Sequence, residues 1–142
     1  MKHNGSAKWN GGLKDGTGTL TTGSHTLKET PYSFRSRFED GKGTNPEELL
    51  GAAHAGCYSM ALSYMLELAG IKPGSVATQA VVTLEAGADG FAITQIHLAT
   101  SISAPGADKA KVLEIAQQAK SGCVISKALA AVPMTLDATV SV

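Results

Sequence analysis

Two cysteines are the side chains best suited to covalent chemistry in this sequence. Cys57 lies inside the apolar stretch EELLGAAHAGCYSMALSYMLELAG, residues 47–70, whereas Cys123 follows the dipeptide SG and precedes a predicted short helix over residues 124–131. Burial disfavours a thiolate, so Cys57 is expected to be inert unless a cation from another element stabilises its ionised form. Cys123 differs from it, because the start of a helix favours a thiolate.

Two thiols in such settings could reduce a peroxide. One thiolate attacks the O–O bond and becomes a sulfenic acid, and the second condenses with it to form a disulfide. The separation of Cys57 and Cys123 matches no C-x-x-C redox or zinc pattern. From spacing alone, a peroxide-reducing pair and two unrelated buried thiols are both open interpretations.

The cation that Cys57 would need has three candidates. Arg35 and Arg37 are the only arginines of the chain and lie in PYSFRSRFE, residues 31–39, whose alternation predicts a strand. A guanidinium stays charged when it is desolvated, but both arginines fall on the same face of that strand, so alternation does not choose between them. His54, one helical turn before Cys57, is the third candidate, although a histidine on a buried helix is more often a packing residue.

Glu48 could hold such an arginine in place. It lies nine positions before Cys57, which on a helix is about 13 Å along the axis and roughly half a turn around it. One continuous helix therefore cannot place both side chains in one pocket, and the carboxylate would act through a long arginine or from a second subunit. The alternative is that Glu48 only completes a capping box with Asn45 at the start of the helix.

Composition argues against several other classes of protein. Lysine plus arginine equals aspartate plus glutamate, 12 each, and no basic run offers the phosphate contacts of a nucleic-acid-binding protein. No signal peptide or membrane-spanning stretch is recognisable, so a cytoplasmic location is expected, where structural disulfides are rare. His54 and Cys57 could share a metal ion, but no second pair completes a site, and neither a metal nor another cofactor is expected.

The order of the predicted elements indicates an α+β fold with a mostly antiparallel sheet and no βαβ crossover. A helix that starts at Asn45-Pro46 and ends at Gly70 is apolar on almost every side, which marks a buried central helix. A chain of 142 residues is about one domain, spanning 1–142, and such a helix in so small a domain predicts an obligate homodimer. The other predicted elements are two strands within 16–29, one over 31–39, a hairpin over 75–86 and 90–104, helices over 108–120 and 124–131, and a strand over 133–142.

Two motifs resemble those of a known family. RFEDGKGTNPEELLGAAHAGCYSMAL, residues 37–62, and GCVISKALAAVPMTLDA, residues 122–138, are similar to the OsmC/Ohr family of bacterial organic hydroperoxide reductases, most of all to its OsmC branch. The resemblance extends over essentially the whole chain, and the pair of motifs is more specific than either alone. It implies a thiol-dependent peroxidase that forms an intertwined homodimer, with sheets wrapped around two central helices and active sites at the subunit interface.

The resemblance also implies a role for four residues of this sequence. Cys57 is matched to the peroxidatic cysteine, which becomes a sulfenic acid, and Cys123 to the resolving cysteine, which forms an intrasubunit disulfide with it. Arg37 is matched to the arginine that stabilises the thiolate, and Glu48 to the glutamate that binds and orients that arginine. A composite site in a dimer would also remove the distance problem, because Glu48 need not come from the helix that carries Cys57.

An enzyme is therefore the main functional hypothesis. The resemblance implies a peroxiredoxin-like peroxidase of the stress response that reduces organic hydroperoxides and, more weakly, hydrogen peroxide. Its disulfide would be reduced by a dithiol, with the lipoyl groups of a protein, thioredoxin and a small thiol as the candidates. The alternative is a small-molecule or lipid-binding protein on the same scaffold, which would need none of the four residues. A thiol-based redox sensor would need an output surface such as a DNA-binding element, and none is visible in the sequence.

Overall fold

The computed structural model describes all residues from Met1 to Val142 and divides the chain into two compact units, Met1–Leu49 and Leu50–Val142. Each unit has its own three-stranded sheet. Helix α2 (Pro46–Leu68) begins in the first unit and runs on in the second. The α+β fold class expected from the sequence is confirmed, whereas a single domain over residues 1–142 stays a prediction.

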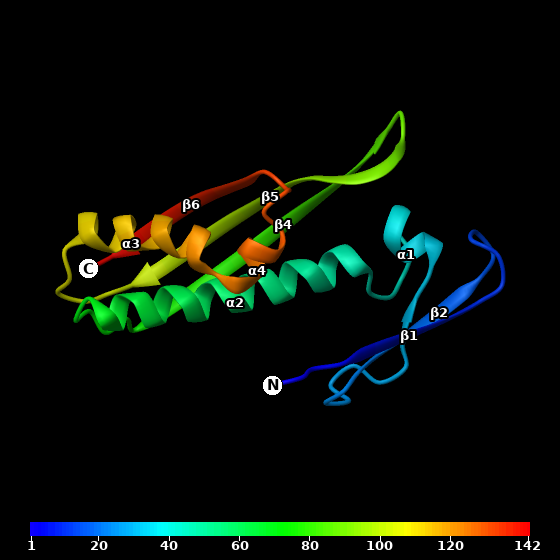
Figure 1. The fold of residues 1–142 in the computed structure, drawn as a ribbon, viewed down its shortest axis with the longest axis horizontal. Coiled ribbons are helices and arrows are strands. Elements are labelled where there is room, and N and C mark those ends of the chain that lie inside the picture. The colour runs from blue at the N-terminus through cyan, green and yellow to red at the C-terminus, as the bar shows by residue number, and fades with distance from the viewer. The chain divides into compact units, whose positions relative to one another are not determined.

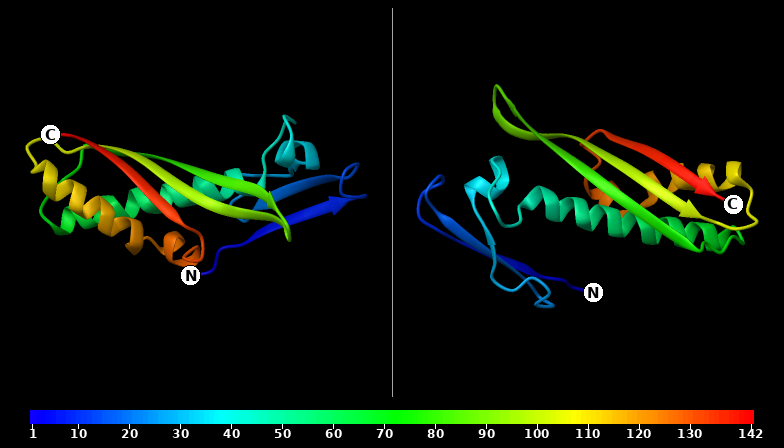
Figure 2. Two further views of the ribbon diagram at one scale, coloured as in Figure 1. Left: turned by 90° about the horizontal axis from the view of Figure 1, so that it is seen from above. Right: turned by 180° about the vertical axis from the view of Figure 1, so that it is seen from behind.

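In the second unit, two helices cover one face of a sheet (Figures 1 and 2). The sheet has the order β4-β5-β6, with β4 at Ser75–Gly87, β5 at Gly90–Ser103 and β6 at Met134–Ser141. The helices are α2 and α3 (Lys109–Gly122), and the short helix α4 (Val124–Ala128) follows α3.

This sheet combines an expected hairpin with an unexpected parallel strand. β4 and β5 pair antiparallel, with Gly87 opposite Gly90 across a two-residue turn, which confirms the predicted hairpin. β6 pairs with β5 in parallel, from Ile96 opposite Met134 onward, so the prediction that the fold has no βαβ crossover is wrong. The segment between β5 and β6, with its two helices, is long enough for such a crossover, and the pattern of a single strand does not indicate its direction.

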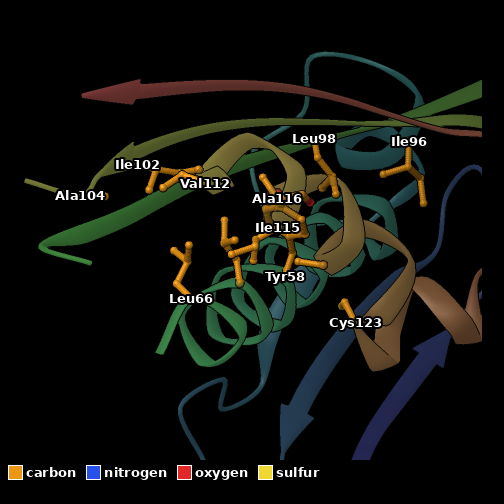
Figure 3. Packing of buried hydrophobic residues seen from close by; sticks show 12 residues of the cluster. Tyr58, Leu66, Ile96, Leu98, Ile102, Ala104, Val112, Ile115, Ala116 and Cys123 are labelled. Atoms are coloured by element: carbon orange, nitrogen blue, oxygen red, sulfur yellow. Dashed lines mark hydrogen bonds between the residues drawn. The ribbon is translucent and has the colours of Figure 1, made fainter. Parts of the chain in front are cut away.

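The hydrophobic core of the second unit lies between the sheet and the two helices (Figure 3). Along β5, the buried residues Ile96, Leu98 and Ile102 occupy alternate positions, so one face of this strand points at the helices. Both helices contribute buried side chains, namely Tyr58, Leu62 and Leu66 from α2 and Val112, Ile115, Ala116 and Ala119 from α3.

Helix α2 begins and ends where the sequence predicts. Asn45 caps its start, since its side-chain oxygen accepts a hydrogen bond of 2.8 Å from the backbone N–H of Glu48. At the other end Gly70 has a φ of +75°, and the N–H groups of Gly70 and Ile71 bond to carbonyls of the last turn. These two bonds form the Schellman pattern, which ends a helix at a residue in the left-handed region.

One side of α2 is covered by the rest of the second unit and the opposite side is not. The covered side is a row of fully buried residues at four-residue spacing, His54, Tyr58, Leu62 and Leu66. The opposite side carries Met60, Tyr64 and Leu68, which are 77%, 62% and 70% exposed. The two rows are two residues out of step, which is about 200° around a helix. The helix is thus apolar nearly all round, as predicted, but the rest of the second unit covers only one side.

The two C-terminal helices meet at Cys123. Asp108 caps the start of α3, since its carboxylate accepts a hydrogen bond of 2.9 Å from the N–H of Ala110. Cys123 is both the C-cap of α3 and the N-cap of α4, which confirms its predicted place at a helix start. α4 ends at Ala128 and is shorter than the helix predicted over 124–131.

The first unit holds an antiparallel sheet of order β1-β2-β3, with β1 at Gly5–Asn10, β2 at Thr17–Thr22 and β3 at Thr30–Tyr32. Of the two strands predicted within residues 16–29, only β2 forms, because residues 23–29 make a loop and the returning strand is β3. Strand β1 was not predicted. The alternation of Ala7 and Trp9 with polar neighbours is the signal that could have found it.

A helix replaces part of the strand predicted over residues 31–39. This helix, α1, spans Phe34–Phe38. Ser33 and Ser36 form a capping box in which each hydroxyl accepts a hydrogen bond from the backbone N–H of the other residue, at 3.1 and 2.9 Å. The first and last phenylalanines of α1 pack one turn apart, with ring centroids separated by 4.9 Å. Their spacing fits a helix as well as it fits the alternation of a strand.

We expect Gly70→Ala to destabilise the protein by about 1–2 kcal/mol, because an L-residue is strained in the left-handed region. Gly87→Ala is the matched control, since its added Cβ would make only an ordinary contact, 3.6 Å from the carbonyl oxygen of Gly90. Urea unfolding at one fixed protein concentration measures both free energies of unfolding. Equal stability of Gly70→Ala and the wild type would contradict the Schellman ending of α2.

Candidate active site

Cys57 of α2 and Cys123, at the junction of α3 and α4, lie against each other. Their Sγ atoms are 2.8 Å apart and hydrogen-bonded, and both side chains are free thiols. An S–S bond is about 2.05 Å long, so a disulfide would require only a small movement. Cys123 is 1% exposed, whereas Cys57 is only partly buried. The expectation that Cys57 is the deeply buried thiol is therefore corrected, because Cys57 lies beside the covered row of α2 and outside it.

The surroundings of Cys57 work against its ionisation. Burial raises the pKa of the Cys57 thiol, and its hydrogen bond with Cys123 raises it further. The backbone N–H groups of Ile125 and Val124, at the start of α4, act in the opposite direction without reversing the shift. Within Leu50–Val142 no cation contributes to the pKa of this thiol. That Cys57 needs a cation from another element therefore stays a prediction, and its physical reason is the raised pKa of this thiol.

The surroundings of Cys123 favour its ionisation. Burial by itself raises the pKa of the Cys123 thiol, but hydrogen bonds from Cys57, from the N–H and hydroxyl of Ser126 and from the N–H of Ile125 outweigh burial and lower it. The first N–H groups of a helix have no partner within the helix, so the start of α4 can supply such donors. Because each thiol can donate or accept, the shared proton stays on Cys57 when Cys123 is ionised.

His54 does not supply the cation for Cys57. Its ring is fully buried, Nε2 lies 2.8 Å from Oγ of Ser126, and Nδ1 has no hydrogen-bond partner. Burial lowers the pKa of His54 and favours its neutral form. Ser126 was not predicted as a site residue, because its contact with His54 joins residues 72 positions apart and no local pattern indicates it.

Arg37 forms an ion pair with Glu47, and Glu48 does not take part in it. Nη2 of Arg37 is 2.7 Å from Oε1 of Glu47, and Nε is 3.2 Å from both carboxylate oxygens. The side chain of Glu47 is only 11% exposed, whereas Glu48 is exposed and contributes its backbone N–H to the Asn45 cap. The expected pairing of Arg37 with Glu48 is therefore corrected to Glu47. Adjacent residues of a helix point about 100° apart, so only one of the two acids faces Arg37.

The turn between α1 and α2 brings Arg37 to Glu47. Ser36 donates its hydroxyl hydrogen to the carbonyl of Thr44 at 2.8 Å, and Asn45 donates its side-chain N–H to the carbonyl of Ser36 at 3.1 Å. Asn45 thus caps α2 and holds α1 at the same time. Arg35 lies two positions away on α1, about 200° around the helix, and pairs instead with the exposed Glu39 at 3.3 Å.

An aromatic pocket of about 250 Å³ lies beside Arg37 in the first unit. The guanidinium carbon of Arg37 is 5.1 Å from the ring centroid of Phe38, and the rings of Trp9 and Tyr32 are 5.3 Å apart. The pocket is lined by Trp9, Leu13, Tyr32, Ser33, Phe34, Arg37 and Phe38. It offers one fixed positive charge on a mostly apolar wall.

Of the four residues singled out in the sequence, three fall into two groups and Glu48 belongs to neither. Cys57 and Cys123 are in contact in the second unit. Arg37 forms an ion pair with Glu47 in the first unit. No three histidine, cysteine or acidic side chains come together as metal ligands would. None of the helices is long and apolar enough to cross a membrane.

Comparisons with known proteins find relatives that match nearly the whole chain. A protein relative from Escherichia coli K12, Peroxiredoxin OsmC, is 51% identical over 133 residues, which cover 94% of this chain and 92% of the relative. The protein of the same name from Shigella flexneri matches with the same identity and coverage.

Solved structures support the fold at lower identity. The organic hydroperoxide resistance protein OhrB of Bacillus subtilis matches with a TM-score of 0.71 and 22% identity, over 96% of this chain and 98% of that one. An OsmC-like protein from Mycoplasma pneumoniae matches with a TM-score of 0.77 and 16% identity, over 100% and 99% of the two chains. The family described as OsmC-like protein matches residues 39–137. With that match and the 51% identical relatives, the chain belongs to the OsmC-like protein family.

Proposed function

We propose that this protein is a thiol-dependent peroxidase that reduces organic hydroperoxides, and hydrogen peroxide more weakly, through Cys57 and Cys123. The observation that carries the proposal is the pair of free thiols with Sγ atoms 2.8 Å apart. The relatives that are 51% identical are named as peroxiredoxins, which supports the same chemistry. A small-molecule or lipid-binding protein would need no such pair.

In the proposed cycle, the Cys57 thiolate attacks one oxygen of the peroxide. The O–O bond breaks, the other oxygen leaves as an alcohol after it takes up a proton, and Cys57 becomes a sulfenic acid. The Cys123 sulfur then attacks the Cys57 sulfur, the S–O bond breaks and water leaves. A dithiol, for which the lipoyl groups of a protein are the proposed source, reduces the disulfide to two thiols. The cytoplasm, where thiols are kept reduced, is the proposed location.

Arg37 is the proposed source of positive charge for Cys57. Burial raises the pKa of the Cys57 thiol within its own unit, and a neighbouring guanidinium can lower the pKa of an acid by about 1–3 units. Glu47 takes the orienting role that the sequence analysis gave to Glu48, because three contacts of 2.7–3.2 Å join its carboxylate to Arg37. The aromatic pocket beside Arg37 supports an organic peroxide as the substrate, since apolar rings would hold an alkyl or aryl group.

A homodimer is the proposed working state. Because α2 is continuous from Pro46 to Leu68, Glu47 and Cys57 are about 15 Å apart along its axis. A dimer in which the ion pair of one subunit completes the thiol site of the other avoids this distance. The exposed row of Met60, Tyr64 and Leu68 offers the apolar surface that such a dimer would bury.

We expect Cys57→Ser to abolish turnover, whereas Cys123→Ser should form one sulfenic acid per site and then stall or overoxidise. The reason is that only Cys57 attacks the peroxide in the proposed cycle, while Cys123 is needed to remove the sulfenic oxygen. Mass spectrometry after one equivalent of cumene hydroperoxide should find a Cys57–Cys123 disulfide in the wild type. Sulfenic acid trapped on Cys123, with Cys57 still reduced, would reverse the two roles.

Arg37→Ala should raise the pKa of Cys57 by at least about one unit and slow peroxide reduction at neutral pH by roughly a hundredfold. A raised thiol pKa removes thiolate at neutral pH, so the lost rate should return as the pH rises. Glu47→Gln should act in the same direction but less strongly, because Glu47 orients Arg37 and holds no charge on the sulfur. The measurement is the pH dependence of Cys57 alkylation with Cys123 replaced by Ser.

Arg35→Ala and Glu48→Gln are the matched controls for that titration, since both side chains are exposed and neither contacts Arg37. They should titrate like the parent protein. A shift in Glu48→Gln without one in Glu47→Gln would show that the wrong acid has been chosen. No shift in Arg37→Ala would remove this arginine from the mechanism.

Met60→Glu should disrupt the proposed dimer, because it buries a carboxylate in the apolar row of α2. Gln117→Glu is the control, since it adds the same charge at an exposed position on α3. Sedimentation velocity at micromolar concentration should give a dimer for the wild type and for Gln117→Glu, and dissociated, partly unfolded chains for Met60→Glu. A wild-type chain that sediments as a stable, active monomer is incompatible with the proposal.

A further inference from the structure

His54 is a buried polar side chain that the proposed reaction does not use. Its Nε2 atom lies 2.8 Å from Oγ of Ser126, and its Nδ1 atom is buried without a partner. Ser126 is 5% exposed and lies on α4, three residues after Cys123. Ser126 is the third residue of α4, whose N-cap is Cys123, and its backbone N–H and hydroxyl are among the groups that lower the pKa of the Cys123 thiol. Ser126 thus contacts His54 and lies in the first turn of the helix that Cys123 caps.

The unpaired Nδ1 atom indicates which nitrogen of His54 carries the proton. A neutral imidazole has one N–H donor and one acceptor nitrogen. With the hydrogen on Nδ1, a buried N–H would lack an acceptor, whereas with the hydrogen on Nε2 only a lone pair lacks a partner. Buried N–H groups without a partner are rare in proteins. A doubly protonated ring would bury a charge and an unpaired N–H together, and burial lowers the pKa of His54.

We propose that His54 is a positioning residue for the resolving step, an inference that rests on the proposed peroxidase function. Its Nε2–H donates to Oγ of Ser126 and occupies that oxygen as an acceptor. The hydroxyl hydrogen of Ser126 is then free to turn away from His54 and to bond to the sulfur of Cys123. Ser126 stabilises the Cys123 thiolate, and His54 acts on that thiolate only through Ser126.

The resolving step depends on this thiolate. The Cys123 thiolate attacks the sulfur of the Cys57 sulfenic acid, the S–S bond forms, the S–O bond breaks, and the leaving hydroxide is protonated by solvent to give water. The rate of such an attack depends on the fraction of thiol that is ionised. Loss of the Ser126 hydroxyl should therefore slow disulfide formation without slowing the attack of Cys57 on the peroxide.

Other titratable groups near Cys123 do not replace this contact. Burial and the charge of Cys123 raise the pKa of Tyr58, so this phenol stays protonated, and its hydroxyl donates to a backbone carbonyl of α3 at 3.1 Å. Lys120 of α3 and Lys127 of α4 line a surface pocket together with Ser126, but neither is among the groups that shift the pKa of Cys123. Apart from Cys57, Ser126 is thus the only side chain that lowers the pKa of Cys123.

The first test is the pH dependence of Cys123 alkylation in the Cys57→Ser protein, which keeps a hydroxyl donor beside the sulfur. Ser126→Ala should raise the pKa of Cys123 by about one unit, since a hydrogen bond to a charged group is lost. Ser126→Thr keeps the hydroxyl and should restore the parent value. His54→Phe keeps the ring volume and should raise the pKa in the same direction, by less.

The sign of the His54→Phe shift decides between the two tautomers. If Nε2 instead accepted a hydrogen bond from Ser126, removing His54 would free the hydroxyl to turn to Cys123, and the pKa of Cys123 would fall. The proposal is overturned if the pKa of Cys123 falls in His54→Phe, or if it does not change in Ser126→Ala. Nitrogen-15 NMR of His54 gives an answer that needs no variant: the proton should be on Nε2, and a proton on Nδ1 overturns the proposal. His97→Phe is the matched control, because His97 also bonds to a hydroxyl, that of Thr135 at 2.7 Å, on the exposed face of the sheet.

Single-turnover kinetics link the inference to the reaction. With both cysteines present, Ser126→Ala should form the Cys57 sulfenic acid at the wild-type rate and form the disulfide about tenfold more slowly at neutral pH. Equal slowing of both steps would indicate a general loss of structure and overturn the positioning role. The alkylation titration needs no peroxide, so a protein without peroxidase activity would refute the proposed function while the titration still decides the role of His54.

Discussion

Two sulfur atoms at hydrogen-bond distance share one proton, and the chemistry of the second unit depends on where that proton lies. Whatever favours ionisation of Cys123 leaves the proton on Cys57 and opposes ionisation there. This bias is unfavourable for the proposed attack of Cys57 on a peroxide, which is why we propose that a guanidinium from another element stabilises the Cys57 thiolate. It is favourable for the step that follows. In the proposed cycle, once Cys57 has become a sulfenic acid, the donors at the start of α4 still lower the pKa of Cys123 and so favour the thiolate that attacks.

The parts of the fold that could be predicted are those in which several local signals agree. α2 has a cap at Asn45, a proline in its first turn and a glycine at its end, and its boundaries were predicted accordingly. Residues 33–38 carry two competing signals, because Phe34 and Phe38 fit both the alternation of a strand and the spacing of a helical turn. The capping box between Ser33 and Ser36 favours the helix. The parallel direction of β6 depends on tertiary pairing, which a strand pattern does not encode.

The candidate site was predictable in its residue types and less so in its contacts. The different settings of Cys57 and Cys123, together with the family resemblance, were enough to single out both thiols. The choice between Glu47 and Glu48 depends on the direction of Arg37, and that direction depends on α1 being a helix, which the alternation of residues 31–39 did not indicate. The bond between His54 and Ser126 joins α2 to α4 and is visible only when the two helices are packed.

The separation of the two cysteines along the chain gives redox chemistry a mechanical consequence. A bond between Cys57 and Cys123 would close a loop of 66 residues that contains the second half of α2, the β4-β5 hairpin and α3. Restricting the unfolded chain by a loop of that length is worth about 4 kcal/mol in the chain-entropy description of disulfides. Each turnover would therefore alternate between a cross-linked protein that resists unfolding and a reduced one that resists it less. Heat tolerance would then be lowest in the form that is ready to react, and a shortage of reductant would leave the protein in its more durable state.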